Sequence, residues 1–574
     1  MAVKGYFTFV LHSHLPYVLS HGRWPHGTDW VNEATAESYM PILKVLTRLH
    51  KEGRPPKVTL GITPVLTEQL ANESFREEFV YYLKNKIEAA EVDEAYFTRW
   101  NQPTMARLAR MWRDFYGETL TTFEEVYHGD LLAQFRALQD AGSIEIITSA
   151  ATHGYLPLIG YDACINAQIA LGVSSYRRHF GRKPRGVWLP ECAYRPKYRW
   201  AYPVGKVGEE KERRGVEEFL YDHGLKYFIV DSHLLEGGKA LGVYLDRFDI
   251  LRQLWNQFEK ERLTEVNVKQ STHESYLVSS SSKGEKAVAI LTRDPKTSLQ
   301  VWSGEHGYPG DGHYLDFHKK HFPGGHRYWR VTSPKSDLGE KKEYDPDAVE
   351  ERLKENAGHF KDLVKSLLLK HFSETGRPGI VTAPFDTELF GHWWFEGPNW
   401  LYYVLKWIDL DPEIELVTGG EAIDRLHPIH LISLPEGSWG EGGFHWIWLN
   451  DWTKWTWGRV YEAEEKMVEL VKNYGETHDP DLQRILKQLA RELLLLESSD
   501  WQFLISTFSA RDYAELRFTE HYNDFTRLAE MVVKRAGGEA LHQGDWAFFE
   551  DCEKKDTPFP DLDLNWWKEG DPHE

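Results

Sequence analysis

The sequence predicts an α/β protein in which parallel βα units form a closed or nearly closed barrel. Two observations predict this class. Short apolar runs rich in β-branched and aromatic residues recur before residue 413, and helical patterns lie between many of them. Strands that alternate with helices pair in parallel, because each helix carries the chain back to the same edge of the sheet. A helical insertion and an all-α C-terminal domain are expected in addition.

The predicted strands are short and mostly follow a Gly, Pro or Lys break. They are residues 6–12, 57–66, 144–150, 185–190, 226–232, 287–293 and 379–385. The intervening helical patterns include 38–53 and 165–181, and the second of these ends in glycine, as helices often do. The predicted barrel therefore comprises residues 1–66 and 143–412.

Three other segments break this rhythm. Residues 67–142 are polar and largely helical in pattern, which indicates an insertion between two barrel strands. Residues 236–286 are irregular and long enough to act as a lid. Residues 413–545 are predicted to be helical, with Asp479 and Pro480 opening a helix whose leucines recur at three- and four-residue spacing. Residues 546–574 show no periodicity and are predicted to be an irregular tail.

Composition excludes several classes of partner. The chain has 68 Lys and Arg against 88 Asp and Glu, and the resulting net charge of −20 repels nucleic acid and anionic lipid. Its three cysteines lie far apart and form neither a disulfide framework nor a CxxC zinc motif. No apolar stretch approaches the roughly 18 residues of a membrane span, and no signal peptide is evident. We expect a soluble, cytoplasmic protein with a neutral or cationic partner.

Aromatic residues are unusually abundant, with 23 Trp, 28 Tyr and 28 Phe. Flat rings with a polar handle suit the C–H faces of sugars, so this composition favours carbohydrate binding. The alternative is a well-filled core in a thermostable protein. The few Cys and Met and the many Glu and Lys also point to a thermophilic source.

Ionisable residues end nearly every predicted strand. In parallel barrels these ends form the mouth of the active site. The residues concerned are His12, His14, His153, Glu191, Asp231, His233, Asp386 and Glu388. Each has a structural alternative, because the histidines can be capped core residues, Glu191 can pair with Arg195, and Asp386 can cap the following helix.

Glu191 and Asp386 are the candidate catalytic pair. Two carboxylates across a sugar-lined cleft allow one to attack the anomeric carbon while the other protonates the leaving oxygen and later acts as base. The nucleophile must be ionised, whereas the acid must hold its proton near neutral pH through burial or a like charge. Glu388, two residues from Asp386, is a possible source of such a charge.

The neighbours of Glu191 in sequence suggest how it is held. Trp188 lies in the preceding apolar run and is expected to pack against the base of Glu191. Tyr194 and Arg195 follow closely and are expected to orient the carboxylate and keep it ionised.

Six motifs in fixed order resemble glycoside hydrolase family 57, and within it the 1,4-α-glucan branching enzymes. They are HSHLPY (12–17), GITPVL (61–66), WLPECAYRP (188–196), APFDTELFGHWWFEGP (383–398), LPEGSWGEGG (434–443) and ESSDWQF (497–503). The resemblance extends to about residue 540. It implies a distorted (β/α)7 barrel, a helical insertion, a helical C-terminal domain that closes one side of the cleft, and a retaining mechanism.

The resemblance also implies roles for individual residues. Glu191 matches the nucleophile and Asp386 the general acid/base. The positions that match sugar-contacting and groove-forming residues are His12, His14, Trp24, His153, Trp302, Trp439, Trp448 and Asp500. A tyrosine is expected at the tip of a lid loop, and Tyr244 and Tyr276 are both candidates. No metal or organic cofactor is implied.

The implied activity is cleavage of α-1,4 linkages and transfer of the chain to a glucose 6-hydroxyl, with an α-glucan such as amylose or glycogen as donor and acceptor. The nearest alternative is a 4-α-glucanotransferase or α-amylase of the same family. A zinc-dependent hydrolase or deacetylase, with His12, His14, Asp231 and His153 or His233 as ligands, is a second alternative. A non-catalytic glucan-binding protein is a third. We expect a monomer or small homo-oligomer that binds neither nucleic acid nor membrane.

Overall fold

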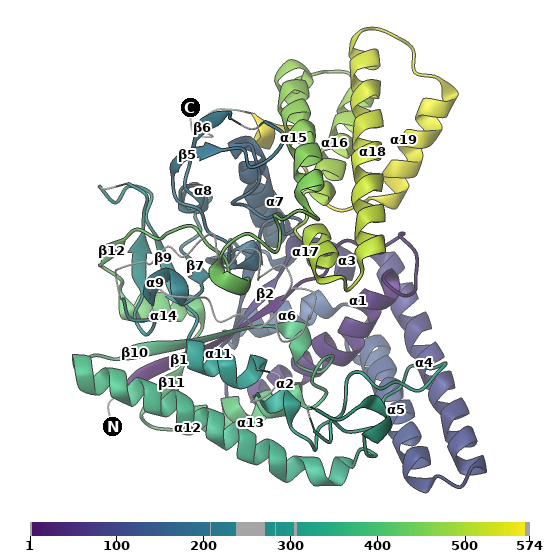
Figure 1. Ribbon diagram of the computed structural model, residues 1–574, viewed down its shortest axis with the longest axis vertical. Coiled ribbons are helices and arrows are strands. Elements are labelled where there is room, and N and C mark those ends of the chain that lie inside the picture. Colours follow the sequence, from purple (N-terminus) through teal and green to yellow (C-terminus); the bar gives the residue numbers. More distant parts are fainter. Residues whose placement is uncertain are drawn as a thin grey trace.

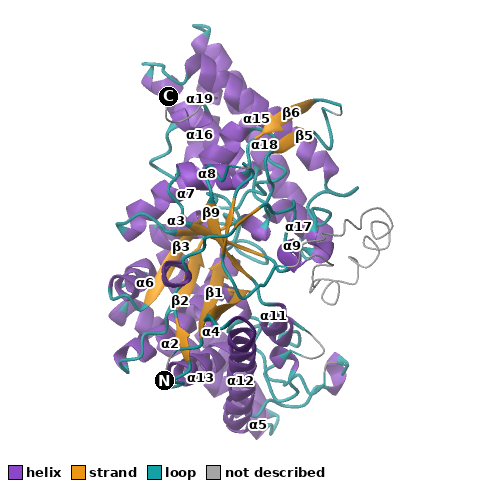
Figure 2. Cartoon of the chain, turned by 90° about the vertical axis from the view of Figure 1, so that its left-hand side faces the viewer, coloured by secondary structure: helices purple, strands orange, loops and turns teal. Residues whose placement is uncertain are grey.

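The computed structural model describes residues 3–206, 208–236, 270–281, 283–303, 307–333 and 335–568. A curled sheet lies at its centre, with helices around it (Figures 1 and 2). In the described part of the chain, seven parallel strands follow one another in the sheet. In spatial order they are β10 (Gly379–Asp386), β1 (Gly5–Ser13), β2 (Val58–Ile62), β3 (Ile144–Ser149), β4 (Gly186–Trp188), β7 (Tyr227–Val230) and β9 (Val288–Thr292).

The two ends of this row of strands meet. Arg293, directly after β9, forms a parallel bridge with Thr382 of β10, and the Asp294 amide donates to the Thr382 carbonyl at 2.9 Å. The sheet therefore curls into a distorted seven-stranded barrel, as predicted. Almost every residue of β1, β2 and β10 is buried, which is expected of parallel strands covered on both faces.

Further strands extend the sheet beyond the seven. Strand β8 (Tyr276–Val278) pairs antiparallel with β9, and β12 (Leu431–Ile432) pairs with β8. Strand β11 (Ile414–Leu416) pairs with β1, so the sheet continues past the predicted barrel boundary at residue 412. A separate hairpin of β5 (Tyr198–Ala201) and β6 (Glu210–Arg213) lies between β4 and β7 in the chain.

Helices connect and cover the barrel strands. They are α1 (Thr28–Ala34), α2 (Met40–Lys51), α3 (Pro64–Ala71), α6 (Leu131–Asp140), α7 (Asp162–Phe180), α8 (Val216–Asp222), α9 (His233–Glu236), α11 (Pro295–Trp302), α12 (Val349–Thr375), α13 (Gly397–Asp409) and α14 (Gly419–Leu426). The helices predicted at 38–53 and 165–181 correspond to α2 and α7. Gly181 ends α7 in the left-handed conformation that glycine adopts without strain.

The segment between β2 and β3 is helical, as predicted. Helices α4 (Glu73–Arg99) and α5 (Pro103–Thr121) form a long antiparallel pair that projects from the barrel at the lower right of Figure 1. Asn72 caps α4 by accepting from the Ser74 amide.

The C-terminal region is a bundle of α15 (Lys454–Tyr474), α16 (Pro480–Leu496), α17 (Asp500–Thr507), α18 (Arg511–Ala536) and α19 (Gln543–Lys555). Figure 1 shows α15, α16, α18 and α19 at the top and the short helix α17 below them. Asp479 caps α16 as predicted, accepting from the amides of Asp481 and Leu482. The first part of the predicted irregular tail is helical instead, because α19 extends to Lys555, and Trp567 further along is fully buried. Within the ranges given above, no helix is both long and apolar enough to span a membrane.

Candidate active site

The candidate site lies at the carboxyl edge of the barrel strands. Strands β10 and β1 pair in a register that places Asp386 beside His12. His12 Nε2 lies 3.1 Å from His153 Nε2, which follows β3. His153 Nδ1 in turn lies 4.0 Å from Glu191 Oε1, which follows β4. Residues that are far apart in sequence therefore meet around one centre, as their positions at strand ends predict.

Three histidines form a stack at this centre. His14 and His153 lie 3.9 Å apart between ring centroids, and His12 and His153 lie 5.1 Å apart. The ring of His12 also stacks on Trp188 at 4.7 Å. Burial lowers the pKa of His12 and of His153 well below the ordinary histidine value, and their neighbouring histidines add to this shift. Both rings are therefore neutral at pH 7.

The backbone at Glu191 and His153 adopts the left-handed conformation, which residues other than glycine rarely adopt. Their φ angles are both 59°, and Cys192 follows with φ 48°. Left-handed backbone at a non-glycine residue costs about 1–3 kcal/mol and concentrates at functional sites. The surrounding structure holds this turn, since the Trp439 amide donates to the Glu191 carbonyl at 3.0 Å.

The Glu191 carboxylate accepts a hydrogen bond from the indole of Trp439, whose Nε1 lies 2.7 Å from Oε2. Only 13% of its side chain is exposed. Burial raises the pKa of Glu191 to about 8, the Trp439 hydrogen bond opposes this shift, and the charges of Asp386 and Asp500 add to it. Asp386 is thus close enough to interact electrostatically with Glu191, and a proton on either carboxyl favours ionisation of the other.

Glu388 belongs to the same centre. Its Oε1 accepts from the Tyr39 hydroxyl at 2.5 Å and from the His14 amide at 3.2 Å. Burial raises the pKa of Glu388 to about 8, and the charge of Asp386 adds to the shift. Glu388 and Asp386 are therefore close enough for the charge of one to shift the pKa of the other, as the sequence suggested.

The C-terminal region contributes two polar groups to the centre. Asp500, the first residue of α17, places Oδ2 2.9 Å from His14 Nε2. The preceding residue, Ser499, places Oγ 3.0 Å from His153 Nδ1. The helical C-terminal bundle is therefore part of the candidate site rather than a separate appendage.

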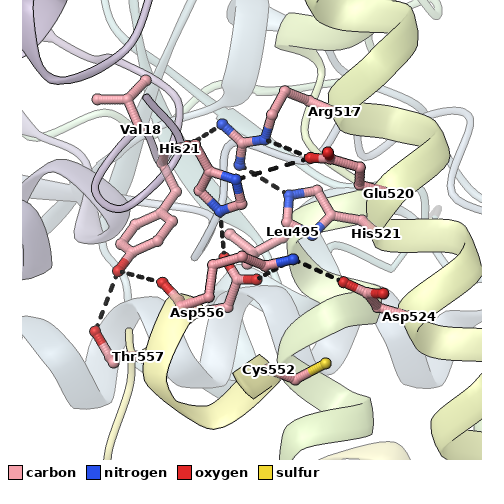
Figure 3. Close-up of polar contacts among 12 residues, drawn as sticks. Val18, His21, Leu495, Arg517, Glu520, His521, Asp524, Cys552, Asp556 and Thr557 are labelled. Atoms are coloured by element: carbon pink, nitrogen blue, oxygen red, sulfur yellow. Dashed lines mark hydrogen bonds and ion pairs between the residues drawn. The ribbon is translucent and has the colours of Figure 1, made fainter. Parts of the chain in front are cut away.

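A buried polar cluster anchors the loop that carries His14 to the C-terminal helices (Figure 3). His21 Nε2 donates to Asp556 Oδ1 at 2.7 Å, and Arg517 donates to the Tyr17 carbonyl at 2.9 Å. Arg517 also donates to His521 Nε2 at 2.9 Å. These contacts join the loop after β1, helix α18 and the segment after α19.

The predicted groove tryptophans occupy four different environments. Trp439 contacts Glu191, as described above. Trp24 is 81% exposed, whereas Trp302 is 7% exposed and packs near Phe385. Trp448 is fully buried and stacks on Tyr155 at 4.5 Å. It therefore supports the loop around Trp439 and offers no face to a ligand.

The two candidates for the lid tyrosine are separated by the structure. Tyr276 lies in β8, is 2% exposed, and its hydroxyl bonds the Ser271 backbone. A side chain fixed in the sheet is not at a loop tip, so Tyr276 is wrong for this role. Tyr244 lies outside the described residues, as does most of the predicted lid segment 236–286.

Two expectations about the surroundings of Glu191 are wrong. The Tyr194 hydroxyl donates to Glu217, and the side chain of Arg195 is fully buried and donates from Nη1 to the Pro196 carbonyl at 3.4 Å. Both side chains follow the left-handed turn at Glu191, which points them away from the carboxylate. Trp439 takes the role that was expected of them.

The structure brings only part of the predicted zinc set together. His14 and His153 lie with Asp500 in a group whose possible ligand atoms are all within 4.8 Å of one another, but the two rings are stacked with 21° between their planes, and Asp500 was not among the predicted ligands. His14 Nδ1 is also engaged with Thr63. Asp231 is occupied elsewhere, since it pairs with Arg293 at 3.4 Å.

Sequence reasoning missed the support beneath Trp439. Arg293 lies 6.0 Å from the Trp439 ring and holds the pKa of Asp231 down to about 2, against the effect of burial. His233 Nε2 bonds the Gly443 carbonyl at 3.2 Å, in the same loop. Arg293 is the last residue of the predicted strand 287–293, so the strand-end argument that selected Asp231 and His233 also applied to it.

Comparison with known proteins agrees with this geometry. Two interacting carboxylates at the mouth of a parallel barrel are the arrangement of enzymes that cleave glycosidic bonds. The profile of glycosyl hydrolase family 57 matches residues 8–435, and a profile described as 1,4-alpha-glucan branching enzyme, C-terminal, matches residues 459–567. The chain belongs to glycosyl hydrolase family 57.

Individual relatives cover nearly the whole chain. The 1,4-alpha-glucan branching enzyme TK1436 of Thermococcus kodakarensis is 42% identical over 558 residues, which are 97% of this chain and 78% of the relative. Its crystal structure aligns with a TM-score of 0.88, covering 99% of this chain and 98% of that one. A branching enzyme from Pyrococcus horikoshii aligns at 0.87 with 40% identity, covering 100% and 98%. The α-amylase AmyC of Thermotoga maritima aligns at 0.80 with 28% identity, covering 99% of each chain.

Proposed function

We propose that this protein is a 1,4-α-glucan branching enzyme that works by retaining double displacement, with an α-glucan as both donor and acceptor. One observation carries the choice of activity within the family. Asp500 and Ser499 lie in the region matched by the branching-enzyme profile, and they bond His14 and His153 beside Glu191. The likeness to two branching enzymes over nearly the whole chain supports the same choice.

In the first half-reaction, Glu191 attacks the anomeric carbon while Asp386 protonates the departing glycosidic oxygen. Trp439 holds Oε2 of Glu191, so Oε1 is the oxygen left to attack. A protonated Asp386 carries no negative charge, and the pKa of Glu191 then falls, because that charge is one of its causes. One proton shared by the two acids therefore produces an ionised nucleophile and a protonated acid together.

In the second half-reaction, Asp386 removes the proton from the 6-hydroxyl of an acceptor glucose, and that oxygen displaces Glu191 from the anomeric carbon. Two inversions give net retention. Water competes with the acceptor at this stage. The low exposure of His12 and His153, 2% each, and of Glu191 supports a site that admits little water.

Two further residues have proposed roles outside the reacting centre. The exposed ring of Trp24 is suited to stack on a sugar of an incoming chain. Tyr244 is proposed as the residue that closes over the bound chain. The proposed setting is the cytoplasm, where three buried, unpaired cysteines remain reduced.

The test is linkage analysis of amylose after incubation with the enzyme. The wild type is expected to create new α-1,6 linkages, and Glu191→Gln and Asp386→Asn are each expected to reduce their rate of formation by at least about a thousandfold. Glu469→Gln, a substitution of a surface acid on α15, is the matched control and should retain full activity.

The likeness to an α-amylase supports one competing function, hydrolysis of the same α-1,4 linkages. Hydrolysis releases reducing ends without new branches. If the product has many new reducing ends and no α-1,6 linkages, the protein is a hydrolase and the proposed branching activity is rejected. The proposed roles of Glu191 and Asp386 would be unaffected by that result. Retained activity in Glu191→Gln would reject both.

A further inference from the structure

A second pocket lies away from the candidate active site and has the opposite charge to the protein as a whole. It has a volume of about 500 Å³ and lies between the β5–β6 hairpin, the start of α7 and the start of α8. Its ionisable lining residues are Lys197, Lys211, Arg213, Arg214, Lys286, Lys568, Asp162, Glu212 and Glu218. Six cations against three acids give this pocket a net charge of +3 in a chain of net charge −20.

Arg213 is the most deeply buried cation among the residues that line this pocket. It is 1% exposed, its Nε donates to Asp162 Oδ1 at 2.5 Å, and its Nη2 donates to the Ile159 carbonyl at 2.8 Å. Its Nη1 has no hydrogen-bond partner among the described residues. A buried guanidinium N–H without an acceptor is costly, so the position calls for a group that accepts hydrogen bonds.

Lys211 is a second cation of this pocket, and unlike Arg213 it has no acid bound to it among the residues that the structure describes. Its Nζ lies 3.7 Å from the centre of the Tyr161 ring and 5.2 Å from that of Tyr202, and it forms no ion pair within the described ranges. Burial lowers the pKa of Lys211 to about 8, the nearby charge of Arg213 adds to this shift, and the charges of Glu464 and Asp162 oppose it only in part. An anion beside Lys211 would stabilise its charged form further.

The start of α7 adds a third source of positive potential. Asp162 and Ala163, the first two residues of this 19-residue helix, line the pocket. Backbone N–H groups at a helix start lack partners within the helix and attract anions, phosphate above all. Tyr161 has no side-chain hydrogen bond that caps the helix. The Asp162 carboxylate already accepts from Arg213 Nε and from the Arg214 amide. Arg213 Nη1 and Lys211 Nζ are therefore the groups that can donate to a ligand.

We infer that this pocket binds a small molecule that carries a phosphate group. A phosphate dianion offers several acceptor oxygens and two negative charges, which match a guanidinium N–H, an ammonium and a helix start better than a single carboxylate does. The volume exceeds that of phosphate alone and falls in the range of small-molecule sites, so a phosphorylated sugar or nucleotide fits the space. The inference does not depend on the proposed branching activity.

The test is isothermal titration calorimetry of the full chain in a buffer without phosphate. The probes are inorganic phosphate and glucose 6-phosphate, with glucose as the neutral control. We expect both anions to bind one site that glucose does not occupy, with binding weakened by added salt. If glucose 6-phosphate binds more tightly than inorganic phosphate, part of the pocket contacts the sugar. If the two bind with equal affinity, the pocket recognises the phosphate group alone.

Lys211→Met tests the site, because it removes the charge and keeps most of the side chain. It should weaken anion binding at least tenfold, and Lys211→Arg should restore it. The matched control is Lys206→Met, since Lys206 lies over the same Tyr161 and Tyr202 rings but does not line the pocket. It should change affinity less than twofold. The inference is overturned if neither anion binds the wild type, or if Lys211→Met binds both as tightly with an unchanged melting temperature.

Discussion

The hydrogen bond from Trp439 to Glu191 sets how much of the proposed nucleophile is ionised, and Trp439→Phe removes it. The bond is 2.7 Å long and lowers a pKa that burial raises to about 8, at which about a tenth of Glu191 is ionised at pH 7. Hydrogen bonds to charged groups contribute about 1.5–3 kcal/mol, or about 1–2 pKa units. The ionised fraction at pH 7 should therefore fall about 10- to 100-fold.

The assay is the pH dependence of kcat/KM for branching in wild type and variant. We expect the acidic limb of the profile to move to higher pH by about one to two units, with activity recovering as the pH rises. Trp446→Phe is the control, because it removes an indole N–H that bonds a backbone carbonyl in the same loop. An equal loss at every pH, with the limb unmoved, would refute the view that Trp439 acts through ionisation of Glu191.

Three other perturbations have definite expected outcomes. Asp500→Asn removes a charge that raises the pKa of Glu191, so the acidic limb of the same profile should shift to lower pH; a shift upward would contradict this. Asp556→Ala leaves the buried His21 Nε2 donor without its acceptor, and it should lower the free energy of unfolding by about 1–3 kcal/mol in denaturant titrations; a loss under about 0.5 kcal/mol would contradict this. Burial lowers the pKa of His521 in the folded state, so as the pH falls through about 6.5 the unfolded chain binds a proton at this residue before the folded chain does. The melting temperature should therefore decrease as the pH is lowered from about 6.5. His521→Gln should make this decrease less steep, and an unchanged slope would exclude His521 as its source.

The barrel and the ring of site residues could be predicted from sequence because both depend on local patterns. A buried parallel strand is a short run of β-branched and aromatic residues, and its end is marked by the first polar side chain. This reasoning placed His12, His153, Glu191 and Asp386 at one edge, where the structure brings them together.

The contacts of Glu191 could not be predicted in the same way. Sequence proximity suggested Tyr194 and Arg195, but the left-handed turn at Glu191 and Cys192 directs the chain elsewhere. The actual donor, Trp439, lies 248 positions away. Such a partner is fixed by tertiary packing, which no local pattern encodes.

The tail illustrates the opposite limit. Residues 546–574 carry no clear periodicity, yet α19 begins at Gln543 and Trp567 is buried. A helix with many charged residues forms there because the rest of the bundle supplies its packing surface. Burial of this kind is invisible in a sequence that has too few apolar positions to show a repeat.

The account depends most on Glu191 forming a covalent bond to the donor sugar while Asp386 acts as the acid and base. Mass spectrometry of Asp386→Ala incubated with α-maltosyl fluoride tests this directly, because fluoride leaves without acid assistance and the variant lacks the base that discharges the intermediate. We expect a maltosyl adduct on the peptide that contains Glu191. An adduct on another residue, or none under conditions in which fluoride is released, would contradict it.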